Sequence, residues 1–126
     1  MPFTQISLRK GKSPDYRREL MEEIYLAMRE SINIPENDRF ATVTELEEGN
    51  ISNSGDYLGI SRSDDIVYIQ ITLNGGRTTD KKKVLYAKIA ERLHANLGIR
   101  KEDVVISLLE VSPEDWSLGN GEAQYA

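Results

Sequence analysis

The proline at position 2 is the residue of this chain best suited to unusual chemistry. An initiator methionine is normally removed before a residue as small as proline, which would leave a secondary amine at the mature amino terminus. An α-amino group titrates at about 7.7 to 8.0, and burial or nearby cations bring its pKa towards or below neutrality. Such an amine can take up and return protons at physiological pH. The alternative is that Pro2 only begins a strand, because proline is tolerated at a strand's first residue.

Arg77 is a second candidate, because it follows Gly75 and Gly76 in a turn after an apolar run. A guanidinium in such a turn can bind a carboxylate through two parallel hydrogen bonds. Its counterpart in the first half of the chain is Lys12, so a solvated turn cation is the alternative.

That counterpart exists because the chain nearly repeats itself at an offset of 65 residues. Residues 2–46 and 67–111 are the two copies, and ten aligned pairs are identical. Such a repeat is one supersecondary unit used twice. Asp38 pairs with Asp103, which favours a structural turn or capping role for both aspartates. The functional alternative is that Asp38 orients a water or polarises a carbonyl beside Pro2.

Each copy is predicted as strand, helix, strand. Apolar residues alternate along the strands and recur at helical spacing between them. Ser13 and Thr78 are suited to cap the helices, and Gly98 to end the second one. The predicted strands span residues 3–8, 40–45, 66–73 and 104–111, and the predicted helices run from Pro14 to near Asn33 and from Thr78 to Gly98.

A β-α-β unit of this length makes its two strands parallel through a right-handed crossover. Two units side by side give an α+β fold, a four-stranded mixed sheet with both helices on one face. We expect another subunit to cover the opposite face, which carries Phe3, Gln5, Ser7, Tyr68, Gln70 and Thr72. Outside the repeat lie a connection over residues 47–65 and a tail over residues 112–126. The Gly-Asn-Gly of the tail suits a hairpin that extends a neighbour's sheet.

Composition limits the class of partner. With 21 acidic and 16 basic residues the net charge is −5, which repels phosphate backbones and argues against nucleic acid. The chain has no cysteine, so disulfides and thiolate metal sites are excluded. Its 126 residues fit one domain. No stretch has the length of a membrane span or the pattern of a signal peptide, so we expect a cytoplasmic protein with no membrane partner.

Five stretches of the chain resemble the tautomerase superfamily, in particular its malonate semialdehyde decarboxylase-like branch. They are Met1–Phe3, Ile34–Phe40, Tyr57–Ser63, Gly76–Thr78 and Glu114–Gly121. The resemblance implies a homotrimer of duplicated β-α-β chains whose chemistry needs no cofactor and is built around the amino-terminal proline.

The resemblance also implies roles for other residues. Asp38 would assist Pro2, and Arg77 would bind the substrate carboxylate. An apolar wall of the site would be formed by Trp116, Leu118 and Tyr125. From the residues alone, simple packing of the tail is the alternative for this wall.

The chain departs from the family at Gly75, where a second carboxylate-binding arginine is expected. Losing one of two such groups costs orientation and charge neutralisation. Arg39 and Arg62 are the alternative cations for this role.

Together these residues predict an enzyme that moves a proton on a small 2-oxo or 3-oxo acid. Neutral Pro2 would act as the base, whereas a cationic Pro2 would polarise the carbonyl of a β-keto acid during decarboxylation. One alternative is a non-catalytic trimeric binding protein on the same scaffold. Another is an enzyme that hydrates or dehalogenates an unsaturated acid with a water activated at Asp38.

Overall fold

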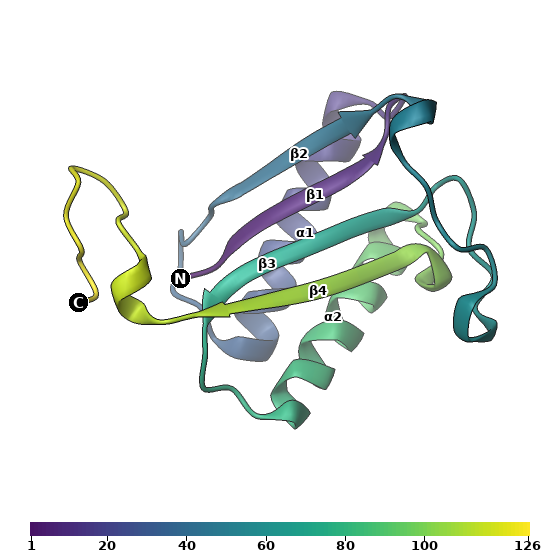
Figure 1. Cartoon of the computed structure of the whole chain (residues 1–126). Coiled ribbons are helices and arrows are strands. Elements are labelled where there is room, and N and C mark those ends of the chain that lie inside the picture. The colour runs from purple at the N-terminus through teal and green to yellow at the C-terminus, as the bar shows by residue number, and fades with distance from the viewer.

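Four strands and two long helices follow one another in the predicted order (Figure 1). The computed structural model describes every residue from Met1 to Ala126. The strands are β1 (Phe3–Arg9), β2 (Ala41–Leu46), β3 (Val67–Asn74) and β4 (Val104–Val111), and the helices are α1 (Pro14–Ile32) and α2 (Thr79–Leu97). Neither helix is long and apolar enough to cross a membrane.

Side-chain caps begin both helices at the predicted residues. Ser13 Oγ accepts a hydrogen bond of 3.1 Å from the backbone N–H of Tyr16. Thr78 Oγ1 accepts one of 3.2 Å from the backbone N–H of Lys81. Gly98 ends α2 with a left-handed φ of 67°, which glycine adopts without steric cost. The cap at Thr78 also fixes the end of the turn that carries Arg77.

The sheet has the strand order β2-β1-β3-β4 and is mixed, as predicted. β1 runs parallel to β2 and antiparallel to β3, and β3 runs parallel to β4. Phe3 therefore lies opposite Thr72, and Asn74 lies opposite Val111. This register brings the start of β1, the start of β2 and the ends of β3 and β4 to one end of the sheet, called here the Pro2 end.

Both helices cover the same face of the sheet (Figure 1). Alternate residues of β1 and β3 are buried against them, including Ile6, Ile69 and Ile71. The other face is open in the single chain, and Gln5 and Gln70 lie opposite each other in its centre and are exposed. The prediction that both helices lie on one face of the sheet is confirmed.

The tail differs from its prediction. Ser112 and Asp115 cap a short turn (Pro113–Asp115), and residues 116–126 form turns without a strand. The side chain of Gln124 bonds two backbone groups that a hairpin would pair with a second strand. Its Oε1 accepts from the N–H of Leu118 and its Nε2 donates to the oxygen of Gly119, both at 2.9 Å. The predicted hairpin is therefore not formed within this chain, and the tail stands away from the sheet (Figure 1).

Candidate active site

Pro2 is buried immediately before β1, at the Pro2 end of the sheet. The backbone N–H of Thr4 donates to Phe40 O at 2.9 Å, which ties this segment to the residues before β2. Beside Pro2 is a cavity of about 200 Å³ lined by Met1, Phe3, Phe40, Trp116, Ser117 and Leu118. Met1 stands in this cavity and its peptide bond occupies the proline nitrogen. Loss of Met1 would both free the amine and enlarge the space around it.

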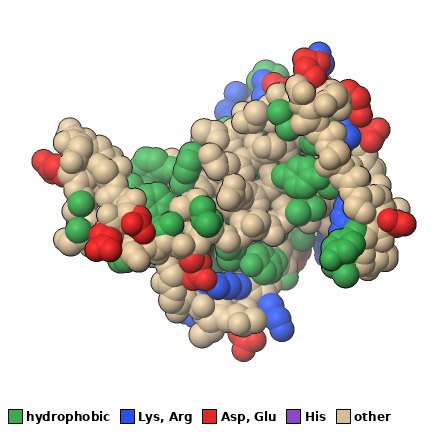
Figure 2. Space-filling model, in the orientation of Figure 1, with side chains coloured by type: hydrophobic (Ala, Val, Ile, Leu, Met, Phe, Trp, Pro, Cys, Tyr) green, Lys and Arg blue, Asp and Glu red, His purple; other side chains and the backbone are tan.

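Hydrophobic side chains gather beside this cavity. They are visible at the left of Figure 2, between the tail and the sheet. Two of the three predicted wall residues, Trp116 and Leu118, line the cavity together with Phe3 and Phe40. Tyr125 is 45% exposed and is not among the lining residues. The single chain therefore assembles part of the predicted apolar wall and leaves Tyr125 outside it.

Asp38 is held in a tight turn between α1 and β2. The Tyr25 hydroxyl accepts a hydrogen bond of 3.0 Å from the backbone N–H of Asn37, which adopts a left-handed φ of 65°. Asp38 itself is only 9% exposed, and its buried Oδ1 has no hydrogen-bond partner. An unpartnered carboxylate oxygen in this position is costly for the fold.

The electrostatics of Asp38 connect it with the amino terminus. Burial raises the pKa of the Asp38 carboxyl, and the positive charge of the chain's amino terminus opposes this shift. The amino terminus and Asp38 therefore interact across the start of β1. The charge of the amino terminus thus acts on Asp38, but Asp38 is not among the residues that line the cavity beside Met1.

Asp103, the repeat partner of Asp38, has a different environment. It is fully buried, and its two carboxylate oxygens accept hydrogen bonds from the backbone N–H and the hydroxyl of Ser63, at 2.7 and 2.6 Å. These bonds attach the long connection to the start of β4. The structural role that the repeat suggested for both aspartates is thus filled by Asp103 and not by Asp38.

Arg77 is half-buried in the turn after β3, at the Pro2 end. Its Nη1 donates to the backbone oxygen of Asn74 at 3.0 Å. Trp116 Nε1 donates to the side-chain Oδ1 of the same asparagine at 2.7 Å. Asn74 therefore links the predicted carboxylate-binding arginine with the apolar wall.

Gly75 lies next to the carboxylate of Glu110 and supplies no positive charge of its own. A Cβ atom at Gly75 would lie 3.1 Å from Glu110 Oε2, and Glu110 is paired with Lys82 at 2.6 Å. The two alternative arginines are engaged elsewhere. Arg39 lies 4.0 Å from the centre of the Tyr25 ring and pairs with Glu22, and Arg62 donates to backbone carbonyls of its own connection. Neither lines the cavity beside Met1.

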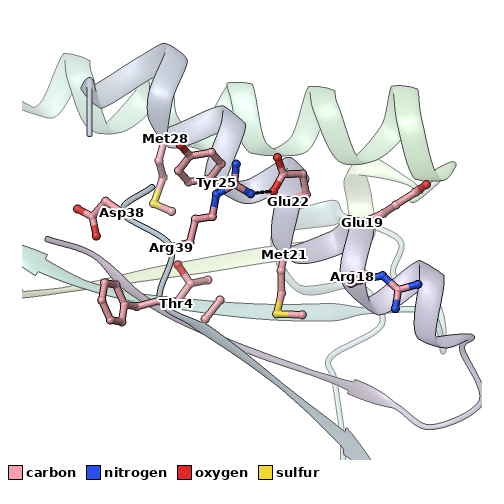
Figure 3. Close-up of a pocket in the computed structure, with 11 residues that line it drawn as sticks. Thr4, Arg18, Glu19, Met21, Glu22, Tyr25, Met28, Asp38 and Arg39 are labelled. Atoms are coloured by element: carbon pink, nitrogen blue, oxygen red, sulfur yellow. Dashed lines mark hydrogen bonds and ion pairs between the residues drawn. The ribbon is translucent and has the colours of Figure 1, made fainter. Parts of the chain in front are cut away.

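A second cavity, of about 450 Å³, lies between α1 and the start of β2. Figure 3 shows Asp38 at one end and Arg18 at the other, with Met21, Tyr25 and Met28 between them. The buried Thr4 Oγ1 on this cavity has no hydrogen-bond partner. Phe40 lines this cavity and the one beside Met1, so it separates the two.

The sequence motifs did not indicate Thr4 and Phe40, which line the cavities, or Asn74, which bonds Arg77 and Trp116. A signal for Thr4 was available, because its repeat partner is the apolar Ile69 and a hydroxyl in a buried alternating position is unusual. Phe40 lies two residues after Asp38. Asn74 has no signal beyond its position at the end of a strand.

The chain is thus a duplicated β-α-β unit with a buried proline before β1 and, in the turn before β2, a buried aspartate whose Oδ1 has no partner. Residues 38–119 match the model of a family described as "Tautomerase enzyme", and residues 2–60 match another model with the same description. The chain is 46% identical to the probable tautomerase YusQ of Bacillus subtilis (strain 168), over 98% of each chain. The chain belongs to the tautomerase family, as its sequence motifs predicted.

Solved structures agree with this assignment. The chain is 35% identical to FG41 malonate semialdehyde decarboxylase inhibited by 3-bromopropiolate, with a TM-score of 0.91 over 98% of this chain and 93% of that one. A fused 4-OT wild-type symmetric trimer is 21% identical, with a TM-score of 0.79 over 98% and 97% of the two chains. The second likeness shows the fold alone. The decarboxylase supports the branch of the superfamily that the motifs indicated.

Proposed function

We propose that this tautomerase-family chain moves a proton on a small oxo acid, with the amine of a mature Pro2 as the base. The neutral amine takes a proton from the carbon next to the carbonyl, and the electron pair of that C–H bond forms an enolate. The same ammonium then returns the proton to the enolate, on oxygen or on carbon. No atom is gained or lost overall.

The other site residues support the two ends of the substrate. Arg77 binds the carboxylate, because its guanidinium offers parallel donors with a fixed geometry. Asp38 acts on the carbonyl end. Its buried carboxyl group, with an Oδ1 that has no partner in the chain, orients a water or polarises the carbonyl there.

The observation that carries this proposal is the contrast between the two repeat aspartates. Asp103 receives two hydrogen bonds, whereas Asp38 is buried beside the amino terminus with an oxygen that nothing in the chain satisfies. A fold keeps such a group where a ligand or a reacting proton will meet it.

Replacement of Pro2 by Ala tests the proposal. Alanine also permits removal of Met1, so the variant keeps an amine but loses the secondary amine of the ring. With phenylpyruvate as substrate we expect kcat/KM to fall at least about a hundredfold. Pro14→Ala, in the first turn of α1, is the matched control and should retain activity. Unchanged activity of Pro2→Ala would refute the proposed base, and a wild type inactive on every oxo acid would favour the binding-protein alternative.

Decarboxylation of a β-keto acid is the second candidate, supported by the likeness to FG41 malonate semialdehyde decarboxylase. In that reaction a cationic Pro2 would polarise the carbonyl, and the C–C bond pair would move into the enol as carbon dioxide leaves. The pH profile separates the candidates. Activity that rises with pH through the amine's pKa indicates the base, and activity that falls indicates the acid. A hydratase or dehalogenase would instead turn over 3-halo acrylates.

We also propose a homotrimer. The open sheet face, with Leu109 49% exposed on it, supports contact with further copies. Light scattering should therefore give about three times the chain mass of 14.3 kDa. A monomer at micromolar concentration would refute this assembly.

A further inference from the structure

Asn74 connects two parts of the site that are distant in sequence. It is the last residue of β3, and its main chain pairs with Val111. Its backbone oxygen accepts from Arg77 at 3.0 Å, and its side-chain oxygen accepts from Trp116 at 2.7 Å. A side-chain substitution at Asn74 therefore removes the bond to Trp116 and keeps the backbone bond to Arg77.

The bond with Trp116 fixes which way the amide of Asn74 points. An indole N–H can only donate, so the group that faces it must be the amide oxygen and not the nitrogen. The Nδ2 group is thereby turned away from the indole. Its two hydrogens have no acceptor within the chain, although the side chain is half-buried. Two donors that no protein group accepts, carried by the residue that bonds Arg77, are available to an oxygen atom of a ligand.

The positive charge around Arg77 is lower than it would be if position 75 also carried an arginine. Gly75 contributes no cation, and the Glu110 carboxylate lies against it. The Lys82 hydrogen bond is the main cause of the lowered pKa of Glu110, and the backbone N–H of Gly76 and the charge of Arg77 add to it. Because Glu110 is paired with Lys82, this turn is left with the single positive charge of Arg77, and a second anionic group on a substrate would meet little attraction.

We infer that the side-chain amide of Asn74 donates a hydrogen bond to the substrate carboxylate beside Arg77, and that the site therefore selects oxo acids with one carboxylate over those with two. The inference rests on the proposed function for the identity of the substrate. It assigns to a neutral donor the place that a second arginine holds in the family pattern. It also gives the indole N–H of Trp116 a positioning role, in addition to the place of the ring in the apolar wall, because this N–H orients the Asn74 amide.

Binding measured by titration calorimetry tests this inference without requiring turnover. The probes are 2-oxobutyrate, with one carboxylate, and 2-oxoglutarate, with two, added to the full chain in its native assembly. We expect the wild type to prefer 2-oxobutyrate. Asn74→Ala should weaken its binding at least about tenfold, since a hydrogen bond to a charged group is lost. Asn96→Ala is the matched control and should bind as the wild type does, because Asn96 lies in the last turn of α2 and its side chain bonds Glu23 of α1.

Two further variants separate the donor from general loosening of the strand end. Asn74→Asp keeps an acceptor for Trp116 and nearly the same shape, but it replaces the donors by a negative charge. We expect it to bind 2-oxobutyrate more weakly than Asn74→Ala does. Trp116→Phe should weaken binding in the wild type and have no added effect in Asn74→Ala, because its effect passes through the asparagine.

The inference is overturned if Asn74→Ala binds 2-oxobutyrate like the wild type, if the wild type prefers 2-oxoglutarate, or if the Trp116→Phe and Asn74→Ala effects simply add. Absence of binding in the wild type overturns it as well. These results are independent of the reaction. A wild type that binds with the expected pattern but shows no proton transfer refutes the proposed function and leaves the carboxylate site standing.

Discussion

At the scale of single residues, Asp38 and Asp103 occupy the same place in the two halves of the chain but have different surroundings. Asp103 is hydrogen bonded by Ser63 at both carboxylate oxygens, and Asp38 has a buried oxygen without a partner. The fold therefore gains stability from one aspartate and loses it at the other. A loss of this kind is typical of groups kept for function.

Matched substitutions measure this difference. Asp38→Asn should stabilise the chain at pH 7 by roughly 1 kcal/mol, because it removes a buried charge. Asp103→Asn should destabilise it by about 2 kcal/mol or more, because hydrogen bonds to a charged group are weakened. Urea unfolding of both variants gives the two free energies. Equal destabilisation by the two substitutions would contradict the assigned roles.

The Asp38 effect should depend on pH. Because the pKa of Asp38 is raised in the fold, the folded chain holds this proton to a higher pH than the unfolded chain does. Wild-type stability therefore falls as pH rises through the raised pKa. The advantage of Asp38→Asn should be small at about pH 3, below both pKa values, and larger at neutral pH. If the stability advantage of Asp38→Asn over the wild type shrinks as pH rises, the fold stabilises the Asp38 carboxylate instead.

Restoring an arginine at position 75 should not restore a second carboxylate-binding group. The backbone there permits a side chain, but its Cβ meets Glu110 Oε2 at 3.1 Å, so the new guanidinium would pair with Glu110. We expect Gly75→Arg to change oxo-acid KM less than about threefold, whereas Gly75→Arg with Glu110→Gln should increase affinity for dicarboxylates. Steady-state kinetics with both substrate types measures this. A large gain from Gly75→Arg alone would be the contrary result.

At the scale of elements, the loop between α1 and β2 positions the candidate site. Tyr25 of α1 holds this loop through the backbone N–H of Asn37, and Asp38 follows directly. Tyr25→Phe removes the acceptor and keeps the ring that Arg39 covers. We expect a loss of about 1 kcal/mol in unfolding free energy and a lower kcat/KM, since Asp38 loses its fixed position.

The control for this substitution is Tyr86→Phe on α2. Tyr86 makes no side-chain hydrogen bond in the chain, so its variant should match the wild type in both measurements. If Tyr25→Phe keeps full kcat/KM while losing stability, then the loop does not need the hydroxyl for function.

The elements themselves were predictable from local patterns. Ser13 and Thr78 marked both helix starts, and alternation marked Phe3–Leu8 as a strand with one buried face. The tail was not predictable in the same way. Its Gly-Asn-Gly signal is a turn signal only, and nothing local shows that Gln124 would satisfy the backbone groups of Leu118 and Gly119.

The site was predictable in part. Pro2, Asp38 and Trp116 could be named from the repeat and the family motifs. Asn74 could not, because its importance comes from contacts with residues 3 and 42 positions away, which only the folded chain brings together. The exposure of Tyr125 likewise depends on how the tail lies in three dimensions.

At the scale of the whole molecule, a charge placed on the open sheet face should prevent copies of the chain from associating there. Gln70 lies in the centre of that face, opposite Gln5, and is exposed in the single chain. Gln70→Lys would bury a charge if further copies cover the face, so we expect dissociation of the trimer. Val84→Lys, on α2 and 51% exposed, is the control that should leave the mass in solution unchanged. A Gln70→Lys variant of unchanged mass would place the interface elsewhere.

If a free Pro2 amine performs the reaction, activity depends on the removal of Met1. Preparations with Met1 retained and with Met1 removed can be quantified by intact mass and assayed with the same oxo acid. We expect activity in proportion to the fraction of chains that begin at Pro2. Chains that keep Met1 and are equally active would contradict it.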